Sequence, residues 1–127
     1  MRAARGPRFE DTLVTAMIES AAAVENLPGI LAVEGLDAVV VGLSDLAYSL
    51  GYPGENEHPE VRRAADRVIA AARLSNRVAA GFNLHHWEEG PEIMAKGVRW
   101  ITIHAKTMLA RGTKELLSKL GNTDGAR

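Results

Sequence analysis

Short apolar runs alternate along the chain with longer stretches in which apolar residues recur every three or four positions. The runs are rich in Val, Ile and Ala, a composition that favours β-strands. The longer stretches have the spacing of amphipathic helices. The pattern therefore predicts four strands, each followed by helical structure, at about residues 12–18, 38–42, 78–82 and 100–104.

Residues that favour helix ends support this division. Ser20 and Ser44 each follow a predicted strand and are good N-cap residues. Pro59 would occupy the first position of the longest helix, where its missing N–H costs nothing. Gly97 is expected as the C′ residue that ends a later helix. The predicted helices begin at about residues 20, 44, 59, 88 and 107, and on the longest one Arg62, Arg63, Asp66 and Arg67 are expected to face water.

The alternation of strand and helix predicts an α/β fold with a parallel sheet and right-handed crossovers. Four such units are too few to close a barrel of eight, and both edge strands of the sheet would be apolar. Because apolar edges favour pairing with another chain, we expect a homo-oligomer or completion by another chain. The expected organisation is a disordered or loop-like tail over 1–11, a folded domain over 12–120 and a frayed tail over 121–127.

Composition narrows the class of protein further. A length of 127 residues indicates one domain. The net charge of −1, with basic residues spread along the chain, argues against nucleic-acid and membrane partners. No apolar stretch approaches the roughly 20 residues of a membrane span. Without cysteine, the chain has no disulfide, thiolate metal ligand or cysteine nucleophile. A cytoplasmic protein is expected.

Two carboxylates stand at the ends of neighbouring predicted strands. Glu19 directly follows the first apolar run, and Asp45 comes shortly after the second. The carboxyl ends of parallel strands are where α/β folds bind ligands, and adjacent strands lie about 4.8 Å apart. The pair could therefore share a hard cation such as Mg²⁺ or Mn²⁺. Alternatively, Asp45 complements a helix dipole and Glu19 is a solvated strand end.

Several segments of the sequence together resemble one enzyme family. They are Met17-Ile18-Glu19-Ser20, Ala23–Leu27, Ile30–Val33, the run from Gly35 through Gly42-Leu43-Ser44-Asp45-Leu46, and His58-Pro59-Glu60-Val61. These segments resemble the second half of the HpcH/HpaI aldolases, class II 2-oxo acid aldolases related to the citrate lyase β subunit. The similarity runs from about Phe9 to Leu120. It implies a partial TIM barrel, the last four β-α units of a (β/α)₈ fold.

The resemblance also implies a metal-dependent lyase. Glu19 and Asp45 match the residues that bind a divalent metal, usually Mg²⁺, Mn²⁺ or Co²⁺. The backbone at Gly42, Leu43 and Ser44 matches the part that receives the carboxylate of pyruvate. The implied reaction cleaves or forms a C–C bond between a pyruvate-type enolate of a 2-oxo acid and an aldehyde, with the metal acting as a Lewis acid.

The sequence departs from the family at several positions. Met17 stands where the family usually has Gln, and His104-Ala105-Lys106 replaces a common Gly-x-Asp. The family's catalytic His and its substrate-binding Arg belong to the first half of the barrel, which this sequence does not contain. His85, His86 and His104 follow predicted strands and are weak candidates for a general base, although adjacent loop histidines are usually solvated. His58 is expected only to open a helix.

Two hypotheses follow from the sequence. In the first, the chain is an aldolase of this family whose active site is completed by another chain or by residues outside this sequence. In the second, it is a catalytically silent half-barrel that acts only as an oligomeric or partner-completed scaffold. The first explains the retained Glu19 and Asp45. The second explains the missing base, and it predicts little or no turnover by this polypeptide alone.

Overall fold

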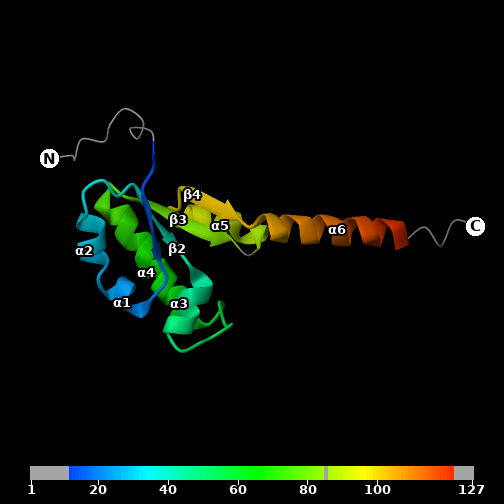
Figure 1. Ribbon diagram of the computed structural model, residues 1–127, viewed down its shortest axis with the longest axis horizontal. Helices are drawn as coiled ribbons and strands as arrows, with labels where there is room; N and C mark the ends of the chain where they lie inside the picture. The colour runs from blue at the N-terminus through cyan, green and yellow to red at the C-terminus, as the bar shows by residue number, and fades with distance from the viewer. Residues whose placement is uncertain (1–11, 85, 122–127) are drawn as a thin grey trace, which may run out of the picture.

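The structure is a parallel sheet of four strands in the order in which they occur in the chain. It is a computed structural model that describes residues 12–84 and 86–121, shown in Figure 1. The predicted tail 1–11 and positions 122–127 of the predicted tail 121–127 lie outside the described residues, whereas residue 121 ends the last helix. The α/β prediction is confirmed. The strands are β1 (Thr15–Ile18), β2 (Ala38–Val41), β3 (Ala79–Leu84) and β4 (Trp100–Ile103).

Helices follow each strand, as the sequence predicts. They are α1 (Ala21–Glu25), α2 (Leu27–Ala32), α3 (Leu43–Ser49), α4 (Pro59–Ser75), the 3₁₀ turn η1 (Trp87–Glu89), α5 (Gly90–Ala95) and α6 (Ala105–Gly121). Repeated strand-helix units with a parallel sheet are the construction of a TIM barrel. The described chain has four of them, so its fold is that of a partial barrel.

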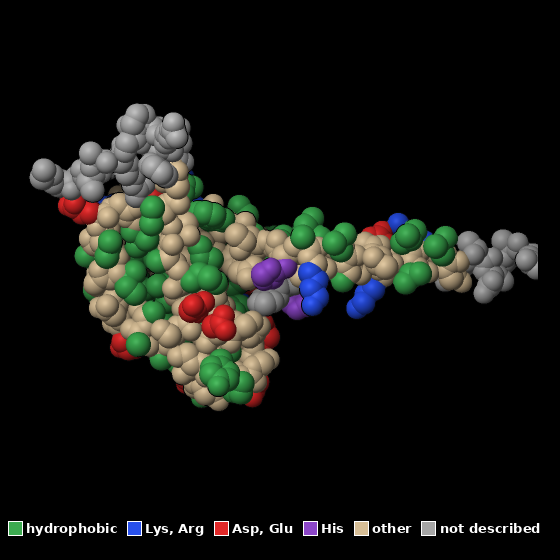
Figure 2. All heavy atoms as spheres, viewed as in Figure 1, with side chains coloured by type: hydrophobic (Ala, Val, Ile, Leu, Met, Phe, Trp, Pro, Cys, Tyr) green, Lys and Arg blue, Asp and Glu red, His purple; other side chains and the backbone are tan. Residues whose placement is uncertain are grey.

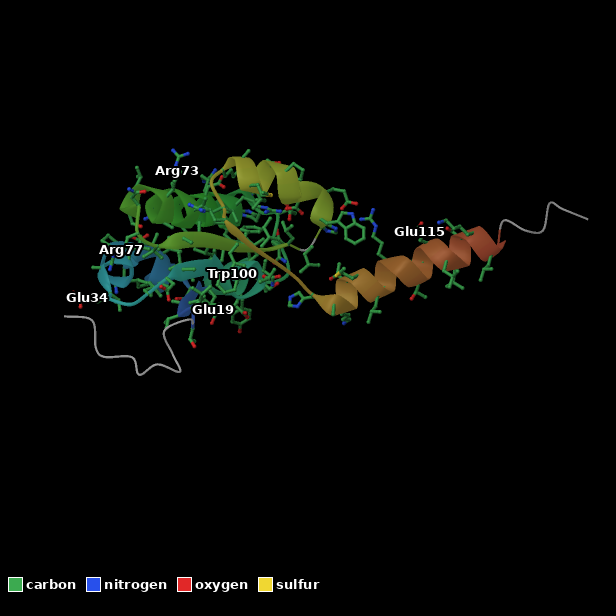
Figure 3. All side chains as sticks on the ribbon, turned by 90° about the horizontal axis from the view of Figure 1, so that it is seen from above. Glu19, Glu34, Arg73, Arg77, Trp100 and Glu115 are labelled. Carbon is green, nitrogen blue, oxygen red and sulfur yellow. The ribbon has the colours of Figure 1, made fainter. Side chains whose placement is uncertain are left out.

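The hydrophobic core lies between the sheet and the helices on one of its faces. Every second residue of the central strands points into it, and α4 presents a continuous apolar stripe to the same side. In Figure 3, α4 and α5 lie on one side of the strands, whereas Glu19 and Trp100 lie on the other. The largest fully buried side chains are Phe82, Ile18, Leu43, Leu46, Ile69, Val39, Val41, Val61 and Val68.

The opposite face of the sheet is not covered by any helix of the described chain. One row of the parallel register on this face consists of Met17, Val40, Gly81 and Trp100. Residues in one row point to the same face of the sheet. Met17 at the β1 edge is 54% exposed. In a complete TIM barrel, this face lines the interior.

The last helix, α6, extends away from the rest of the molecule (Figure 1). It contains no buried residue. At its base, the Arg111 guanidinium lies 3.6 Å from the centre of the Trp87 ring and pairs with Glu88. Its exposed large apolar side chains are Met108, Leu109, Leu116, Leu117 and Leu120. Nowhere in the described ranges does a helix have the length and apolar character needed to cross a membrane.

Helix ends were predicted with mixed success. Ser20 caps α1 by accepting a hydrogen bond from the Ala23 N–H at 3.2 Å, and Gly97 has the left-handed φ of 103° expected after a helix. The prediction for Ser44 was wrong, because α3 begins at Leu43 and its N-cap position is Gly42. Ser44 instead accepts a hydrogen bond from the side chain of Asn56.

The prediction that Arg62 faces water was also wrong. Its guanidinium pairs with Glu57, in the loop before α4, and with Glu89 of η1, and the side chain is 24% exposed. Although burial works against the charge, hydrogen bonds to these two carboxylates raise the pKa of Arg62 above its ordinary value. Arg62 therefore joins the loop before α4 to the segment that follows β3.

Candidate functional site

Glu19 lies at the carboxyl end of β1, directly against the backbone of Gly42 at the end of β2. The Gly42 N–H donates to the Ile18 carbonyl at 3.1 Å, so the pairing of β1 and β2 continues to the ends of both strands. A Cβ atom at position 42 would lie 3.1 Å from Cβ and 3.3 Å from Oε2 of Glu19. Glycine at this position therefore lets the carboxylate approach the chain between β2 and α3.

Asp45 stands in the first turn of α3, which begins immediately after Gly42. Both Asp45 and Glu19 are exposed. Figure 2 shows acidic side chains gathered where β1 ends beside α3. The order β1-β2 makes these strands neighbours, as the sequence predicts. The two carboxylates thus belong to the same edge of the sheet and are open to an ion from solution.

The donor set of this edge suits a hard divalent cation. Mg²⁺ is commonly held by one or two carboxylates, with water and substrate oxygens completing the coordination sphere. Among the residues that the structure describes, no group of three or more His, Asp or Glu is placed to hold a metal ion. Glu19 and Asp45 alone could therefore supply only part of the coordination sphere of such a cation.

A second polar group lies on the sheet near the ends of β3 and β4. The Thr102 hydroxyl donates to Oδ1 of Asn83 over 3.3 Å, and Nδ2 of Asn83 lies 3.0 Å from Nε2 of His104. His104 was a weak candidate from the sequence, but Asn83 and Thr102 were missed. Asn83 is a polar residue between two apolar ones, Phe82 and Leu84, which are buried. This alternation was a signal from which Asn83 could have been predicted as a site residue.

The strand register places this second group on the same face as Glu19. Ile18, Val41, Phe82 and Ile101 are mutual partners across the four strands. The next residues along each strand share the following row and point to the opposite face of the sheet. In that row Asn83 pairs with Thr102, and Glu19 and Gly42 directly follow the last paired residues of β1 and β2, on the face that no described helix covers.

The remaining histidines lie elsewhere. His58 accepts a hydrogen bond from the Glu60 N–H and stacks on Tyr52 with ring centres 3.6 Å apart, so it opens α4 as predicted. His86 is exposed and lines an open cleft of about 520 Å³ together with residues 54–59. His85 lies outside the described residues. No hydrogen bond joins His86 or His104 to Glu19 in the described part of the chain.

Ion pairs fix the segments around these strand ends. The carboxylate of Glu88 accepts a hydrogen bond from its own backbone N–H and another from Arg111, and both lower its pKa. A hydrogen bond to Asp66 is the main reason why the pKa of Lys96 is raised, and this pair links α5 to α4 at 2.9 Å. The loops between β3 and α6 are thus held by charges on three helices.

Comparison with known proteins adds independent evidence. The family model for HpcH/HpaI aldolase/citrate lyase matches residues 2–110. A 2-keto-3-deoxy-L-rhamnonate aldolase from Klebsiella pneumoniae is 36% identical over 116 residues, which are 85% of this chain and 43% of the relative. A 4-hydroxy-2-oxo-heptane-1,7-dioate aldolase from Shigella flexneri is 33% identical over 131 residues, 96% of this chain and 49% of the relative.

Solved structures agree with the sequence comparison. An HpcH/HpaI aldolase/citrate lyase family protein from Burkholderia cenocepacia superposes with a TM-score of 0.80 at 33% identity, over 85% of this chain and 42% of that one. An HpcH/HpaI aldolase from Desulfitobacterium hafniense gives a TM-score of 0.71 at 32% identity. The chain thus spans less than half the length of the relatives that it matches.

Proposed function

Because the chain belongs to the HpcH/HpaI aldolase/citrate lyase family, we propose that it provides the metal-binding part of an aldolase site for 2-oxo acids. The observation that carries this proposal is the Glu19 carboxylate at the end of β1, against Gly42 and beside the helix that carries Asp45. The names of the relatives support the substrate class, since both are aldolases of keto acids.

In this proposal, Glu19 and Asp45 hold Mg²⁺, Mn²⁺ or Co²⁺ through hard carboxylate oxygens. When bound, the cation supplies Lewis-acid stabilisation of the negative charge that develops on the keto oxygen. Leu43 and Ser44 begin α3, and the first N–H groups of a helix have no carbonyl partner within it. They are proposed to donate to the carboxylate of a pyruvate-type substrate, which Gly42 allows to come close.

A scaffold without catalysis is the second candidate function. Its support is the exposed apolar surface of α6 and of the β1 edge, where Leu13 and Met17 are open to solvent. Surfaces of this kind favour association with another chain. This candidate does not require Glu19 or Asp45 to bind anything.

Titration with Mn²⁺ separates the two candidates. Water-proton relaxation of Mn²⁺ is measured with and without pyruvate for the wild-type chain, Glu19→Gln and Asp45→Asn. We expect each substitution to weaken Mn²⁺ binding about tenfold or more, since each removes one of two charged ligands. Glu115→Gln, on the exposed surface of α6, is the matched control and leaves binding unchanged.

The aldolase proposal also requires that pyruvate and Mn²⁺ bind together. Pyruvate should tighten the binding of Mn²⁺ to the wild-type chain, because the keto acid would complete the coordination of the cation. Equal Mn²⁺ binding by the wild type and both site variants contradicts the proposal. Such a result would leave the scaffold function as the better account.

A further inference from the structure

The hydroxyl group of Ser49 joins the two segments that carry the carboxylates of the candidate site. From this contact, we infer that Ser49 is a positioning residue, which fixes Glu19 relative to Asp45 and gives the pair a preference for a small cation. The inference rests on the proposed function, because it takes Glu19 and Asp45 as ligands of one divalent ion. Ser49 acts through the backbone and is not itself proposed as a ligand.

Ser49 is the last residue of α3 and stands one helical turn after Asp45. Residues four positions apart lie on the same side of a helix, and both side chains are exposed. The backbone N–H of Ala21 donates to Oγ of Ser49 at 3.0 Å, across 28 positions of the sequence. Ala21 comes two residues after Glu19 and begins α1. The contact therefore connects the exposed side of α3 to the segment that contains Glu19, and α1 and α3 are neighbours in Figure 1.

Glu19 is thus held on both of its sides in the sequence. Before it, the Ile18 carbonyl accepts a hydrogen bond from the Gly42 N–H at 3.1 Å, and the Ile18 side chain is buried. After it, the Ser49 hydroxyl holds the Ala21 N–H. Both partners belong to the continuous segment that runs from the end of β2 through α3. These two attachments leave the backbone of Glu19 little freedom to move relative to α3.

The two helices differ in how firmly the core holds them. α3 buries three of its seven residues, whereas α1 buries only Val24 of its five. A helix as short as α1 is not stable by itself. An ion pair of Glu25 with Arg67 links its other end to α4, but both side chains are more than half exposed, and such pairs contribute little. The Ser49 contact therefore attaches a weakly held helix to a firmly held one.

A fixed spacing of the two carboxylates matters more to a small cation than to a large one. Mg²⁺ requires near-ideal octahedral geometry with oxygens at about 2.0–2.1 Å, whereas Ca²⁺ accepts irregular sets of oxygens at about 2.3–2.6 Å. Loosening of Glu19 relative to Asp45 should therefore weaken the binding of Mg²⁺ more than that of Ca²⁺. A purely structural role of Ser49 would lower the stability of the chain and affect both ions equally.

Competition against Mn²⁺ in water-proton relaxation gives the affinities of the full chain for Mg²⁺ and Ca²⁺. In Ser49→Ala, we expect the Mg²⁺ affinity to fall about fivefold, the effect of one lost hydrogen bond, and the Ca²⁺ affinity to fall by about twofold at most. Ser49→Thr keeps the hydroxyl and should keep the wild-type preference. Ser20→Ala is the matched control, because it removes a cap of the same helix, the 3.2 Å bond from the Ala23 N–H, without detaching α1 from α3.

A measurement on the wild-type chain keeps the test valid if a variant fails to fold. Coupling between two binding events is reciprocal, so Mg²⁺ should stabilise the Ser49 contact as much as the contact favours Mg²⁺. Hydrogen exchange of the Ala21 amide, followed by NMR, should therefore slow about fivefold when Mg²⁺ saturates the site. The exchange of the amides of α6 should stay unchanged.

The outcomes distinguish this inference from the proposed function. Equal losses for Mg²⁺ and Ca²⁺ in Ser49→Ala, the same loss of preference in Ser20→Ala, or unaltered Ala21 exchange in a chain that binds Mg²⁺ would overturn the inference. In each of these cases, Mn²⁺ binding that depends on Glu19 and Asp45 leaves the proposed function standing. Failure of the wild-type chain to bind any of these cations would reject the proposed function and the inference with it.

Discussion

Gly42 holds the end of β2 so close to Glu19 that a single added methyl group at position 42 would lie 3.3 Å from Oε2 of the carboxylate. The backbone of Gly42 has φ −96°, which alanine adopts without strain. Any effect of Gly42→Ala must therefore come from crowding. The other close atoms are Cβ of Glu19 and Cε of Met17, both at 3.1 Å. Only Met17 Cε is the end of a flexible side chain and can move away.

The first prediction concerns the metal affinity of Gly42→Ala. Displacement of the Glu19 carboxylate should weaken Mn²⁺ binding about five- to tenfold, with a loss of less than about 1 kcal/mol in the free energy of unfolding. Mn²⁺ titration and urea unfolding measure the two quantities. An unchanged affinity would show that the contact with Glu19 does not position a metal ligand.

Gly51→Ala is the contrasting control. Gly51 has a left-handed φ of 89° and no heavy atom within 4 Å of the added Cβ. Alanine there is strained but meets nothing, so about 1 kcal/mol of unfolding free energy should be lost. Mn²⁺ affinity should not change. The two substitutions thus distinguish two effects. Gly42→Ala tests the close contact with Glu19 at the site, and Gly51→Ala tests the conformational requirement of a turn.

The second prediction concerns Arg62, which pairs with Glu57 and Glu89. Arg62→Ala leaves the partly buried carboxylate of Glu89 and the exposed carboxylate of Glu57 without this partner. We expect a loss of roughly 1–2 kcal/mol in the free energy of unfolding. Arg63→Ala removes an exposed i,i+3 pair with Glu60 and should cost about 0.5 kcal/mol or less. Equal losses in urea unfolding would contradict the linking role of Arg62.

Hydrophobic periodicity predicted which segments form strands and in what order along the chain. The reason is that a sheet packed against helices needs apolar residues on the facing sides of both. The parallel runs at β2 and β3 are fully apolar on the helix side, and that signal is local. The polar group of Asn83, Thr102 and His104 was not predicted as a unit. Its members come together only through the register of β3 on β4, and a shift by one residue would have pointed them to the other face.

Contacts between side chains far apart in the sequence could not be predicted either. Arg62 lies at a position where the helical spacing predicts exposure to solvent. Its guanidinium nevertheless donates a hydrogen bond to Glu89, 27 residues further along the chain. Ser44 has the residue type of an N-cap, but the tight passage from β2 into α3 moves the helix start to Leu43. Both errors arise because tertiary contacts override local preference. In contrast, the sequence did predict that the strands followed by Glu19 and Asp45 are neighbours.

The third prediction is a pH dependence at the base of α6. The pKa of Glu88 is below its ordinary value of 4.5, because its own backbone N–H and Arg111 favour the ionised form. The stabilising effect is therefore present above pH 4.5 and is lost as the pH falls through the lowered pKa of the folded state. The indole N–H signal of Trp87, against which Arg111 packs, should shift in that acidic range.

Glu88→Gln tests this assignment. Glutamine cannot ionise, so the shift of the Trp87 signal below pH 4.5 should disappear. Glu115→Gln, in an exposed pair with Lys119 on the same helix as Arg111, should leave it in place. Persistence of the acid shift in Glu88→Gln would show that a different carboxylate controls the contact.

The fourth prediction concerns α6, along which several large apolar side chains are exposed. Leu109, Leu116 and Leu120 recur at intervals of seven and four residues, so they form one stripe along the helix. All three are more than half exposed. A stripe of this kind is stable in water when it packs against another surface, and we expect the chain to associate with itself through it. Sedimentation velocity should show a species larger than a monomer at micromolar concentration.

Leu116→Lys combined with Leu120→Lys should shift the sedimentation of the chain toward the monomer, because two charges would have to be buried in the contact. Ser118→Lys, which lies off the stripe on the same helix, adds charge without that penalty and should leave association intact. Mn²⁺ affinity should be equal in all of these variants if α6 serves assembly alone. A parallel loss of Mn²⁺ binding in the double variant, but not in Ser118→Lys, would instead show that the site at Glu19 needs the associated form.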